Sequence, residues 1–215
     1  MRSGILFDLD GTLWDTVEPL TKSWNLVLRQ KGLPSITLQQ MKSYMGKTPD
    51  EISALMLPSL SLNERRTVIK DCFQAENEYL SLHGGILYPH LEETLSALSK
   101  RYPLFIVSNC SHGYIETFWG YHHLQKYFTD MEYAGRTGKG KGQNIRILMK
   151  RHNLQKAVYV GDTMGDLEAC KEAGIPFIFA SYGFGFVPPD FPSISSFQQL
   201  PDLAEKILNS DSTAI

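Results

Sequence analysis

Cysteine is scarce in this sequence, and the few cysteines stand far apart. Cys72, Cys110 and Cys170 form an odd set among 215 residues and contain no C-x-x-C pair. A disulfide framework needs an even set of cysteines, and a structural zinc site needs closely spaced ones. The sequence therefore argues against both kinds of site and favours a reducing compartment.

Long apolar runs and an excess of charge of one sign are missing too. Residues 4–7 are apolar, but acidic residues follow at once, so the longer apolar stretch of a signal peptide is lacking. No apolar run approaches membrane-spanning length. With a formal net charge of -2, the sequence lacks the excess of positive charge that is typical of proteins that bind nucleic acid or an anionic membrane surface. We therefore expect a cytoplasmic protein, monomeric or homodimeric, without a nucleic-acid or membrane partner.

The sequence does contain several short apolar runs that end in polar or glycine-containing turns. Because the runs are continuously apolar rather than alternating, they are typical of strands buried on both faces of a parallel sheet. They cover residues 4–7, 104–107, 157–160 and 176–180. Helical patterns lie between them at residues 91–100, 114–123, 143–152 and 165–173. This alternation predicts an α/β core with a doubly wound, Rossmann-like parallel sheet.

Residues 16–83 break the alternation, because they contain helical patterns and no strand-like run. The segment Thr48-Pro49-Asp50-Glu51 is typical of a helix start, with Thr as N-cap, Pro at the first helical position and Glu placed for a capping box. Residues 61–82 predict a long helix ended by Gly84-Gly85. We therefore expect a small all-helical cap domain at residues 16–83, inserted after the first strand. The core domain is expected to comprise residues 1–15 and 84–215.

Two carboxylates stand at the end of the first predicted strand, in the segment Asp8-Leu9-Asp10-Gly11-Thr12. Carboxylates this close resist joint ionisation unless a cation lies between them or one stays protonated. Since the chain turns at Gly11, Asp8 and Asp10 can take different positions, one in line with a substrate and one beside its leaving group. An Asx-rich turn in which Asp10 caps the following segment is the alternative interpretation.

Polar residues also follow two later predicted strands. Ser108 and Asn109 come directly after Val107, where a hydroxyl and backbone N–H groups can bind phosphate oxygens. Asp162 and Asp166 stand four residues apart at a predicted helix start, so both can face the same space. Turn formation and helix capping would explain the Ser-Asn pair and one of the two aspartates equally well.

A glycine-rich segment with two lysines, Lys139 and Lys141, precedes the helical pattern that starts near Asn144. A lysine at such a helix entrance suits an anion. The segment nearly matches a nucleotide-binding P-loop, but Gly142 stands where that loop needs Ser or Thr, which argues against a nucleotide site. Lysines that are merely solvated loop charges are the other interpretation.

These segments are more informative together than one by one. In an open α/β sheet, ligands bind outside the carboxyl ends of the strands, and all four segments are expected there. Several carboxylates gathered at one edge would repel one another. Mg²⁺ removes this repulsion, because it prefers oxygen ligands, keeps some of its waters and shares the phosphate oxygens of a substrate. The sequence therefore predicts a phosphoryl-transfer site with Mg²⁺ as cofactor.

At these residues the sequence resembles the haloacid dehalogenase-like (HAD) hydrolases, and within them the phosphoglycolate-phosphatase-like branch with a helical cap of the C1 type. The resemblance covers nearly the whole chain, including the helical segment after the first motif. Its motifs, in the family's order, are Asp8-Leu-Asp-Gly-Thr12, Ser108-Asn109, Lys141 and Gly161-Asp-Thr-Met-Gly-Asp166.

The resemblance implies a role for each charged residue of these motifs. Asp8 is expected to be the nucleophile that becomes phosphorylated and also a metal ligand. Asp10 is expected to be the general acid and base, with its backbone carbonyl on the metal. Asp162 would be a further direct ligand, and Asp166 a partner that reaches the metal through water. Lys141 would steady Asp8 and the phosphoryl group.

The resemblance also implies which residues bind the substrate. Ser108, Asn109 and Thr12 are expected at the phosphate. Lys47, in a turn between two predicted cap helices, occupies the position of the family's specificity loop and can pair with a substrate carboxylate or second phosphate. The family often has proline after its motif lysine, whereas Lys141 stands among glycines, so Lys139 is an alternative for that role.

The sequence thus predicts a phosphatase that hydrolyses a small phosphorylated metabolite, phosphoglycolate-like or a sugar phosphate, through an aspartyl-phosphate on Asp8. A sugar phosphomutase similar to β-phosphoglucomutase uses the same intermediate, and the motifs do not separate the two. A catalytically idle relative that binds a partner protein is an alternative of another class. The clustered charges argue against it, because an idle scaffold has no need of them.

Overall fold

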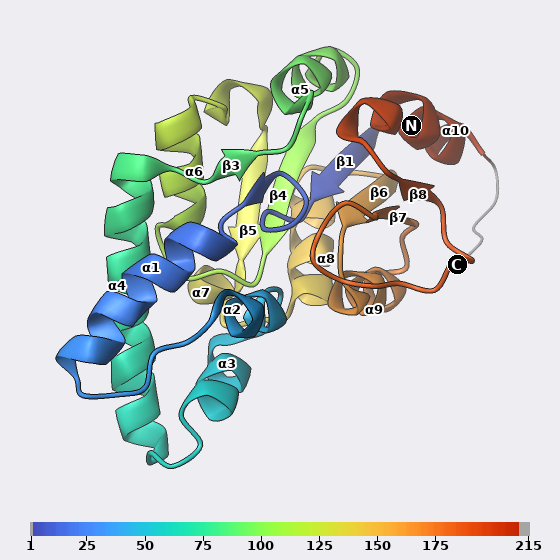
Figure 1. The fold of residues 1–215 in the computed structure, drawn as a ribbon. Coiled ribbons are helices and arrows are strands. Elements are labelled where there is room, and N and C mark those ends of the chain that lie inside the picture. The colour runs from blue at the N-terminus through green and yellow to red at the C-terminus, as the bar shows by residue number, and fades with distance from the viewer. Residues whose placement is uncertain (1, 211–215) are drawn as a thin grey trace.

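The computed structural model describes residues 2–210 and contains a six-stranded, fully parallel sheet (Figure 1). The strand order is β5-β4-β1-β6-β7-β8. The strands are β1 (Ser3–Phe7), β4 (Leu104–Ser108), β5 (Asp130–Tyr133), β6 (Lys156–Gly161), β7 (Phe177–Ala180) and β8 (Ser193–Ile194). The predicted α/β parallel-sheet fold is confirmed.

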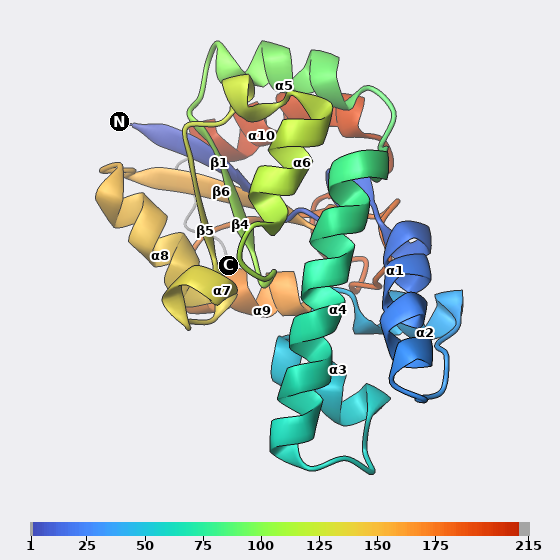
Figure 2. The same cartoon turned by 90° about the vertical axis from the view of Figure 1, so that its left-hand side faces the viewer.

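Helices cover both faces of this sheet, as the view along its edge shows (Figure 2). One face carries α8 (Lys141–Arg151) and α9 (Met164–Ala173), and the other carries α5 (Leu91–Ser99), α6 (Tyr114–His122) and α10 (Leu200–Asn209). Strand β1 is buried on both faces: Ile5 and Phe7 belong to one apolar cluster and Leu6 to the other. This double burial explains why the run is continuously apolar.

Between the first and second strands of the parallel sheet, the chain forms four helices and no strand of that sheet. They are α1 (Val17–Gln30), α2 (Leu38–Tyr44), α3 (Pro49–Met56) and α4 (Leu62–His83). A short antiparallel pair, β2 (Trp14–Asp15) and β3 (Ile86–Leu87), joins the two ends of this helical segment. The all-helical insertion is confirmed, whereas its treatment as a separate domain with boundaries at residues 16 and 83 stays a prediction.

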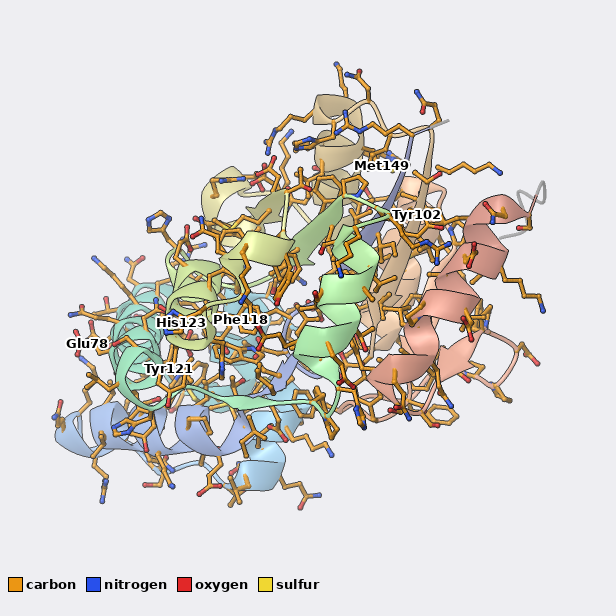
Figure 3. The ribbon with its side chains drawn as sticks, turned by 90° about the horizontal axis from the view of Figure 1, so that it is seen from above. Glu78, Tyr102, Phe118, Tyr121, His123 and Met149 are labelled. Carbon is orange, nitrogen blue, oxygen red and sulfur yellow. The ribbon has the colours of Figure 1, made fainter. Side chains whose placement is uncertain are left out.

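Local signals in the sequence explain where these helices begin and end. Thr48 and Glu51 form the predicted capping box with Pro49 in the first turn, and Ser61 and Glu64 form another at the start of α4. Helix α4 ends at Gly84, whose φ of 66° is left-handed. A Cβ at this position would collide with the ring of Tyr121, which Figure 3 shows next to the cap helices.

Strand β5 was not expected, because its sequence is polar. Ion pairs explain how a polar strand is buried here. Glu132, which is 1% exposed, contacts Arg136 and Arg151, and Asp130 contacts Arg151 and His152. These contacts compensate the carboxylates for the loss of water. The other elements that were not expected are short or lie near the end of the chain: β2, β3, α7 (Ala134–Thr137), η1 (Gln125–Tyr127), η2 (Phe197–Gln199), β8 and α10. No helix within residues 2–210 is both long and apolar enough to cross a membrane.

Candidate active site

The carboxyl ends of β1, β4 and β6 lie side by side in the sheet, and each is followed by a residue of the predicted site. Asp8 follows β1, Ser108 ends β4, and Asp162 follows β6. The backbone N–H of Asp8 donates to the carbonyl of Val160, 2.8 Å away, which extends the pairing of β1 with β6 up to the site. The parallel sheet therefore brings together residues that are 54 to 154 positions apart in the chain.

Lys141, and not Lys139, stands beside the carboxylates. Its Nζ lies 3.0 Å from Asp8 Oδ1 and 2.5 Å from Asp166 Oδ1, and the side chain is almost fully buried. Lys139 is exposed. Helix α8 begins at Lys141, two residues before the predicted start, which fixes this lysine in the first helical turn. Burial alone would lower the pKa of Lys141, but Asp166 and Asp8 raise it above its usual range, so the lysine is charged.

Three buried carboxylates form a group that fits a metal ion. Oxygen atoms of Asp8, Asp162 and Asp166 all lie within 4.8 Å of one another. Asp162 is fully buried, and its Oδ1 has no hydrogen-bond partner among the described residues. Three carboxylates against one lysine leave negative charge uncompensated, and an orphaned buried carboxylate oxygen is a ready ligand for a hard cation. The donor set, all oxygen and all acidic, suits Mg²⁺.

The side chain of Asp10, two residues after Asp8, lies outside the group of three carboxylates. Gly11 has a φ of 81°, and the chain turns there so closely that a Cβ would collide with the Asp162 carboxylate. The side chain of Asp10 accepts hydrogen bonds from Thr16 Oγ1 at 2.6 Å and from Tyr114 Oη at 2.9 Å. Its carboxylate is therefore not part of the three-carboxylate group, whereas that of Asp166 is.

Burial raises the pKa of both aspartates of the first motif. The pKa of Asp8 rises to about 7, although Lys141 pulls it down. The pKa of Asp10 rises to about 6, against the opposing effect of the hydrogen bonds from Thr16 and Tyr114. Burial, followed by the nearby Asp166 and Asp8, also raises the pKa of Asp162. Buried carboxyl groups with raised pKa values are typical of sites that combine a nucleophile with an acid or base.

Of the residues predicted to bind the phosphate or the substrate, some line a cavity next to Asp8 and one does not. Ser108 and Asn109 line a cavity next to Asp8, and the side-chain amide of Asn109 donates to the carbonyl of Gly46 at 3.1 Å. Lys47 lies at the same cavity with its side chain exposed. Thr12 is fully buried away from the cavity, and Tyr182 Oη donates to its carbonyl. Thr12 is not among the residues that line the cavity, and its expected role at the phosphate stays a prediction.

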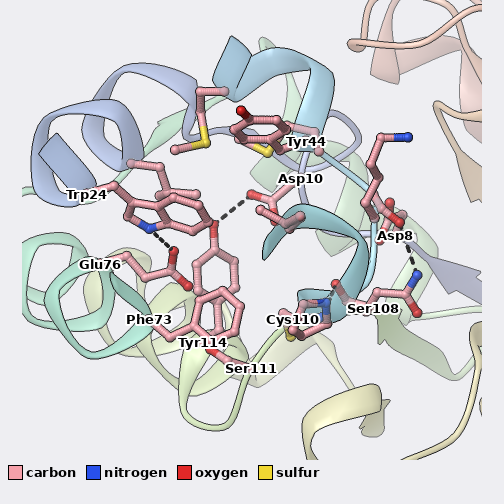
Figure 4. A pocket seen from close by; sticks show the side chains of 18 of the residues that line it. Asp8, Asp10, Trp24, Tyr44, Phe73, Glu76, Ser108, Cys110, Ser111 and Tyr114 are labelled. Carbon is pink, nitrogen blue, oxygen red and sulfur yellow. Dashed lines mark hydrogen bonds between the residues drawn. The ribbon is translucent and has the colours of Figure 1, made fainter. Parts of the chain in front are cut away.

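This cavity lies between the carboxyl edge of the sheet and the cap helices (Figure 4). Its empty volume, including solvent at its mouth, is about 560 Å³. The lining residues are Asp8, Asp10, Leu20, Trp24, Met41, Tyr44, Met45, Gly46, Lys47, Pro49, Ile52, Phe73, Glu76, Ser108, Asn109, Cys110, Ser111, Tyr114 and Lys141.

Several residues of this site were missing from the sequence predictions. The backbone N–H of Phe184 donates to Asp162 Oδ2 at 2.7 Å, and Gly183 packs against the same carboxylate. Glu76 and Trp24 line the cavity from the cap. One signal could have revealed Glu76: it stands four residues after Cys72 and four before Leu80, on the buried stripe of α4.

This fold and site define an α/β enzyme with an acidic, lysine-containing centre. A model of the haloacid dehalogenase-like hydrolases matches residues 5–180. Phosphoglycolate phosphatase of Vibrio vulnificus (strain YJ016) is 30% identical over 200 residues, covering 86% of each chain. That of Aliivibrio fischeri is 30% identical over 203 residues with the same coverage. A crystal structure described as a predicted phosphoglycolate phosphatase from Haemophilus somnus superposes with a TM-score of 0.83 at 22% identity, covering 94% of this chain and 98% of its own.

The chain belongs to the haloacid dehalogenase-like hydrolases, in their phosphoglycolate-phosphatase-like branch. It is an enzyme of the phosphatase type. The interpretation as a catalytically idle scaffold is therefore not supported.

Proposed function

We propose that this chain is a Mg²⁺-dependent phosphatase that hydrolyses a small phosphate monoester through an aspartyl-phosphate on Asp8. The observation that supports this best is the buried group of Asp8, Asp162 and Asp166, in which Lys141 Nζ contacts Asp8 and Asp166, next to a cavity that Asp8 and Lys141 line. The cavity suits a small metabolite such as a phosphoglycolate-like ester or a sugar phosphate. A cytoplasmic location and a monomeric or dimeric state stay predictions from the sequence.

In the first step, a carboxylate oxygen of Asp8 attacks phosphorus, and the bond from phosphorus to the alkoxide oxygen breaks. Lys141 contacts Asp8 and offsets the negative charge of the transferring group. Ser108, on the adjacent strand, faces the cavity and supplies a hydroxyl for a phosphate oxygen. Covalent catalysis replaces one difficult hydrolysis by two easier displacements.

Asp10 supplies the proton that the leaving alkoxide needs. Thr16 and Tyr114 hold its carboxyl in one orientation, and a pKa of about 6 lets it gain and lose a proton near neutral pH. In the second step Asp10 takes a proton from water, which attacks the phosphorus of the phosphorylated Asp8 and releases phosphate. Asp8 and Asp10 then regain their starting protonation states.

When bound, Mg²⁺ would supply positive charge that offsets the phosphate oxygens. Asp8 and Asp162 would hold the ion directly, since Asp162 Oδ1 has no other partner within residues 2–210. Asp10 would contribute its backbone carbonyl, and Asp166, which is already paired with Lys141, would reach the ion through water.

Mg²⁺ is expected to stabilise the folded protein as well as to activate it. At a free concentration of about 100 times its Kd, Mg²⁺ should raise the free energy of unfolding by about 2.7 kcal/mol. Chemical denaturation with Mg²⁺ and with EDTA measures this difference. Asp162→Asn should abolish it, whereas the exposed Asp202→Asn should not. Equal stabilisation of both variants would contradict the proposed ligand set.

A Mg²⁺-dependent screen across phosphorylated metabolites tests the activity itself. Release of free phosphate from small monoesters, lost with EDTA, is the expected result. Isomerisation of a sugar 1-phosphate without phosphate release would instead identify the chain as a mutase.

Lys47 is proposed to contact a second anionic group of a substrate at the mouth of the cavity, where its side chain is exposed. Lys47→Ala should lower kcat/KM several-fold, about threefold to tenfold, for phosphate esters with such a group and should leave neutral esters unchanged, as expected for a solvent-exposed ion pair. Steady-state kinetics on a carboxylated and a neutral ester measures this. Unchanged relative kcat/KM would show that Lys47 has no role in specificity.

A further inference from the structure

The cap end of the active-site cavity holds a carboxyl group that the proposed mechanism does not use. Glu76 on α4 is 3% exposed and lines the cavity. Trp24 Nε1 on α1 donates to Glu76 Oε2 at 2.7 Å, so the orientation of the carboxyl is fixed. Figure 4 shows this pair at the opposite end of the cavity from Asp8. A group bonded to a phosphate at Asp8 would extend towards it.

The surroundings of Glu76 do not compensate its charge. Of the cavity's lining residues, the cations are Lys47, which is exposed, and Lys141, which is paired with Asp8 and Asp166. The neighbouring cap residues that line the cavity are largely apolar: Leu20, Met41, Ile52 and Phe73. Within residues 2–210, no hydrogen bond joins Glu76 Oε1 to another side chain or backbone group. An oriented but incompletely bonded carboxyl among largely apolar cap residues suits a polar group of a ligand.

We propose that Glu76 is a specificity-determining residue that hydrogen-bonds a hydroxyl on the alcohol part of the substrate and disfavours substrates whose alcohol part ends in a carboxylate. This inference rests on the proposed phosphatase function and narrows its substrate class to esters that place a hydroxyl, and no carboxylate, at the Glu76 end of the cavity. A second anionic group of such an ester would lie at Lys47, at the mouth of the cavity.

The discrimination does not depend on the protonation state of Glu76. Burial raises the pKa of Glu76 well above its usual value, although the bond from Trp24 opposes this. An ionised Glu76 would repel a substrate carboxylate at close range. A neutral Glu76 could donate one hydrogen bond, but the apolar surroundings would leave the substrate's buried charge without a counterion. A hydroxyl meets neither difficulty, since it can donate to or accept from the carboxyl in both states.

Two small esters test this inference: 2-hydroxyethyl phosphate, whose alcohol part ends in a hydroxyl, and phosphoglycolate, whose alcohol part ends in a carboxylate. The native enzyme should hydrolyse 2-hydroxyethyl phosphate with the higher kcat/KM. Glu76→Gln keeps the size of the side chain and an oxygen for Trp24, and its amide can donate to a carboxylate. This variant should shift the ratio of the two kcat/KM values towards phosphoglycolate by about tenfold.

Glu78→Gln is the matched control, because Glu78 stands on the same helix with its side chain exposed, at the outer side of the cap (Figure 3). It should leave the ratio unchanged, and thermal unfolding should show that both variants are folded. A native preference for phosphoglycolate, or a ratio that Glu76→Gln leaves unchanged while both esters are still hydrolysed, would overturn the role of Glu76 and leave the phosphatase function standing. Absence of Mg²⁺-dependent hydrolysis of any phosphate monoester would overturn both.

Discussion

Asp8→Asn is expected to lower kcat by at least about ten-thousand-fold, because it removes the nucleophile of the proposed covalent step. Asn has nearly the shape of Asp but carries no charge and is a poor nucleophile. Its amide cannot form the ion pair in which Lys141 Nζ lies 3.0 Å from Asp8 Oδ1. Lys141 keeps its second partner, Asp166, so the fold should persist. Phosphate release under saturating substrate and Mg²⁺ measures the effect.

Asp202→Asn is the control for the Asp8 prediction, since Asp202 is exposed on α10, and this variant should retain full activity. Hydrolysis by Asp8→Asn within about tenfold of the native rate would show that the nucleophile is a different group, such as a directly attacking water.

Lys141→Met is expected to lower the free energy of unfolding by about 3 kcal/mol when Mg²⁺ is absent, because removing one partner leaves buried carboxylates without their counterion. Lys141 is 6% exposed, and its Nζ contacts both Asp8 and Asp166. Methionine has a similar length and fills the same space, so the loss of charge should dominate. Urea denaturation in EDTA measures the change, and kcat should fall as well.

Lys139→Met is the matched control, since Lys139 lies two residues away and is exposed. Its free energy of unfolding should stay within about 0.5 kcal/mol of the native value. If the two variants were equally stable, the buried ion pairs of Lys141 would not stabilise the folded protein.

Much of the fold was predictable because the central strands are buried on both faces. The apolar runs that became β1, β4, β6 and β7 have no polar alternation, and each is followed by a clear turn. The aspartates of the site were predictable for a related reason. A carboxylate directly after a fully apolar run, as at Asp8 and Asp162, lies at a strand end, where the topology of a parallel sheet gathers ligand-binding residues.

The remaining features depend on contacts between distant residues, which a linear pattern does not show. Strand β5 is stabilised by ion pairs of Glu132 with Arg136 and Arg151, and neither arginine belongs to the strand. The choice between Lys139 and Lys141 was open in the sequence, because both stand among glycines. The start of α8 at Lys141 decides which of them is buried.

Glu76 shows a further limit of prediction from sequence. It stands beside Asn77 and Glu78 in a polar stretch of α4, where most acidic residues are solvated. Its inward orientation follows from its spacing to Cys72 and Leu80, and its bonding partner, Trp24, lies on another helix. The cap contributes the residues that contact the variable part of a substrate, so this is also where the sequence motifs are least informative.

Acid quenching followed by mass spectrometry of the peptide that contains Asp8 shows whether this residue carries the phosphoryl group during turnover. With a hydrolysed monoester and Mg²⁺ present, a phosphoryl group on Asp8 is expected during the steady state, with none in EDTA. Rapid turnover with Asp8 never modified, or with the phosphoryl group on Ser108 instead, would contradict the proposed mechanism.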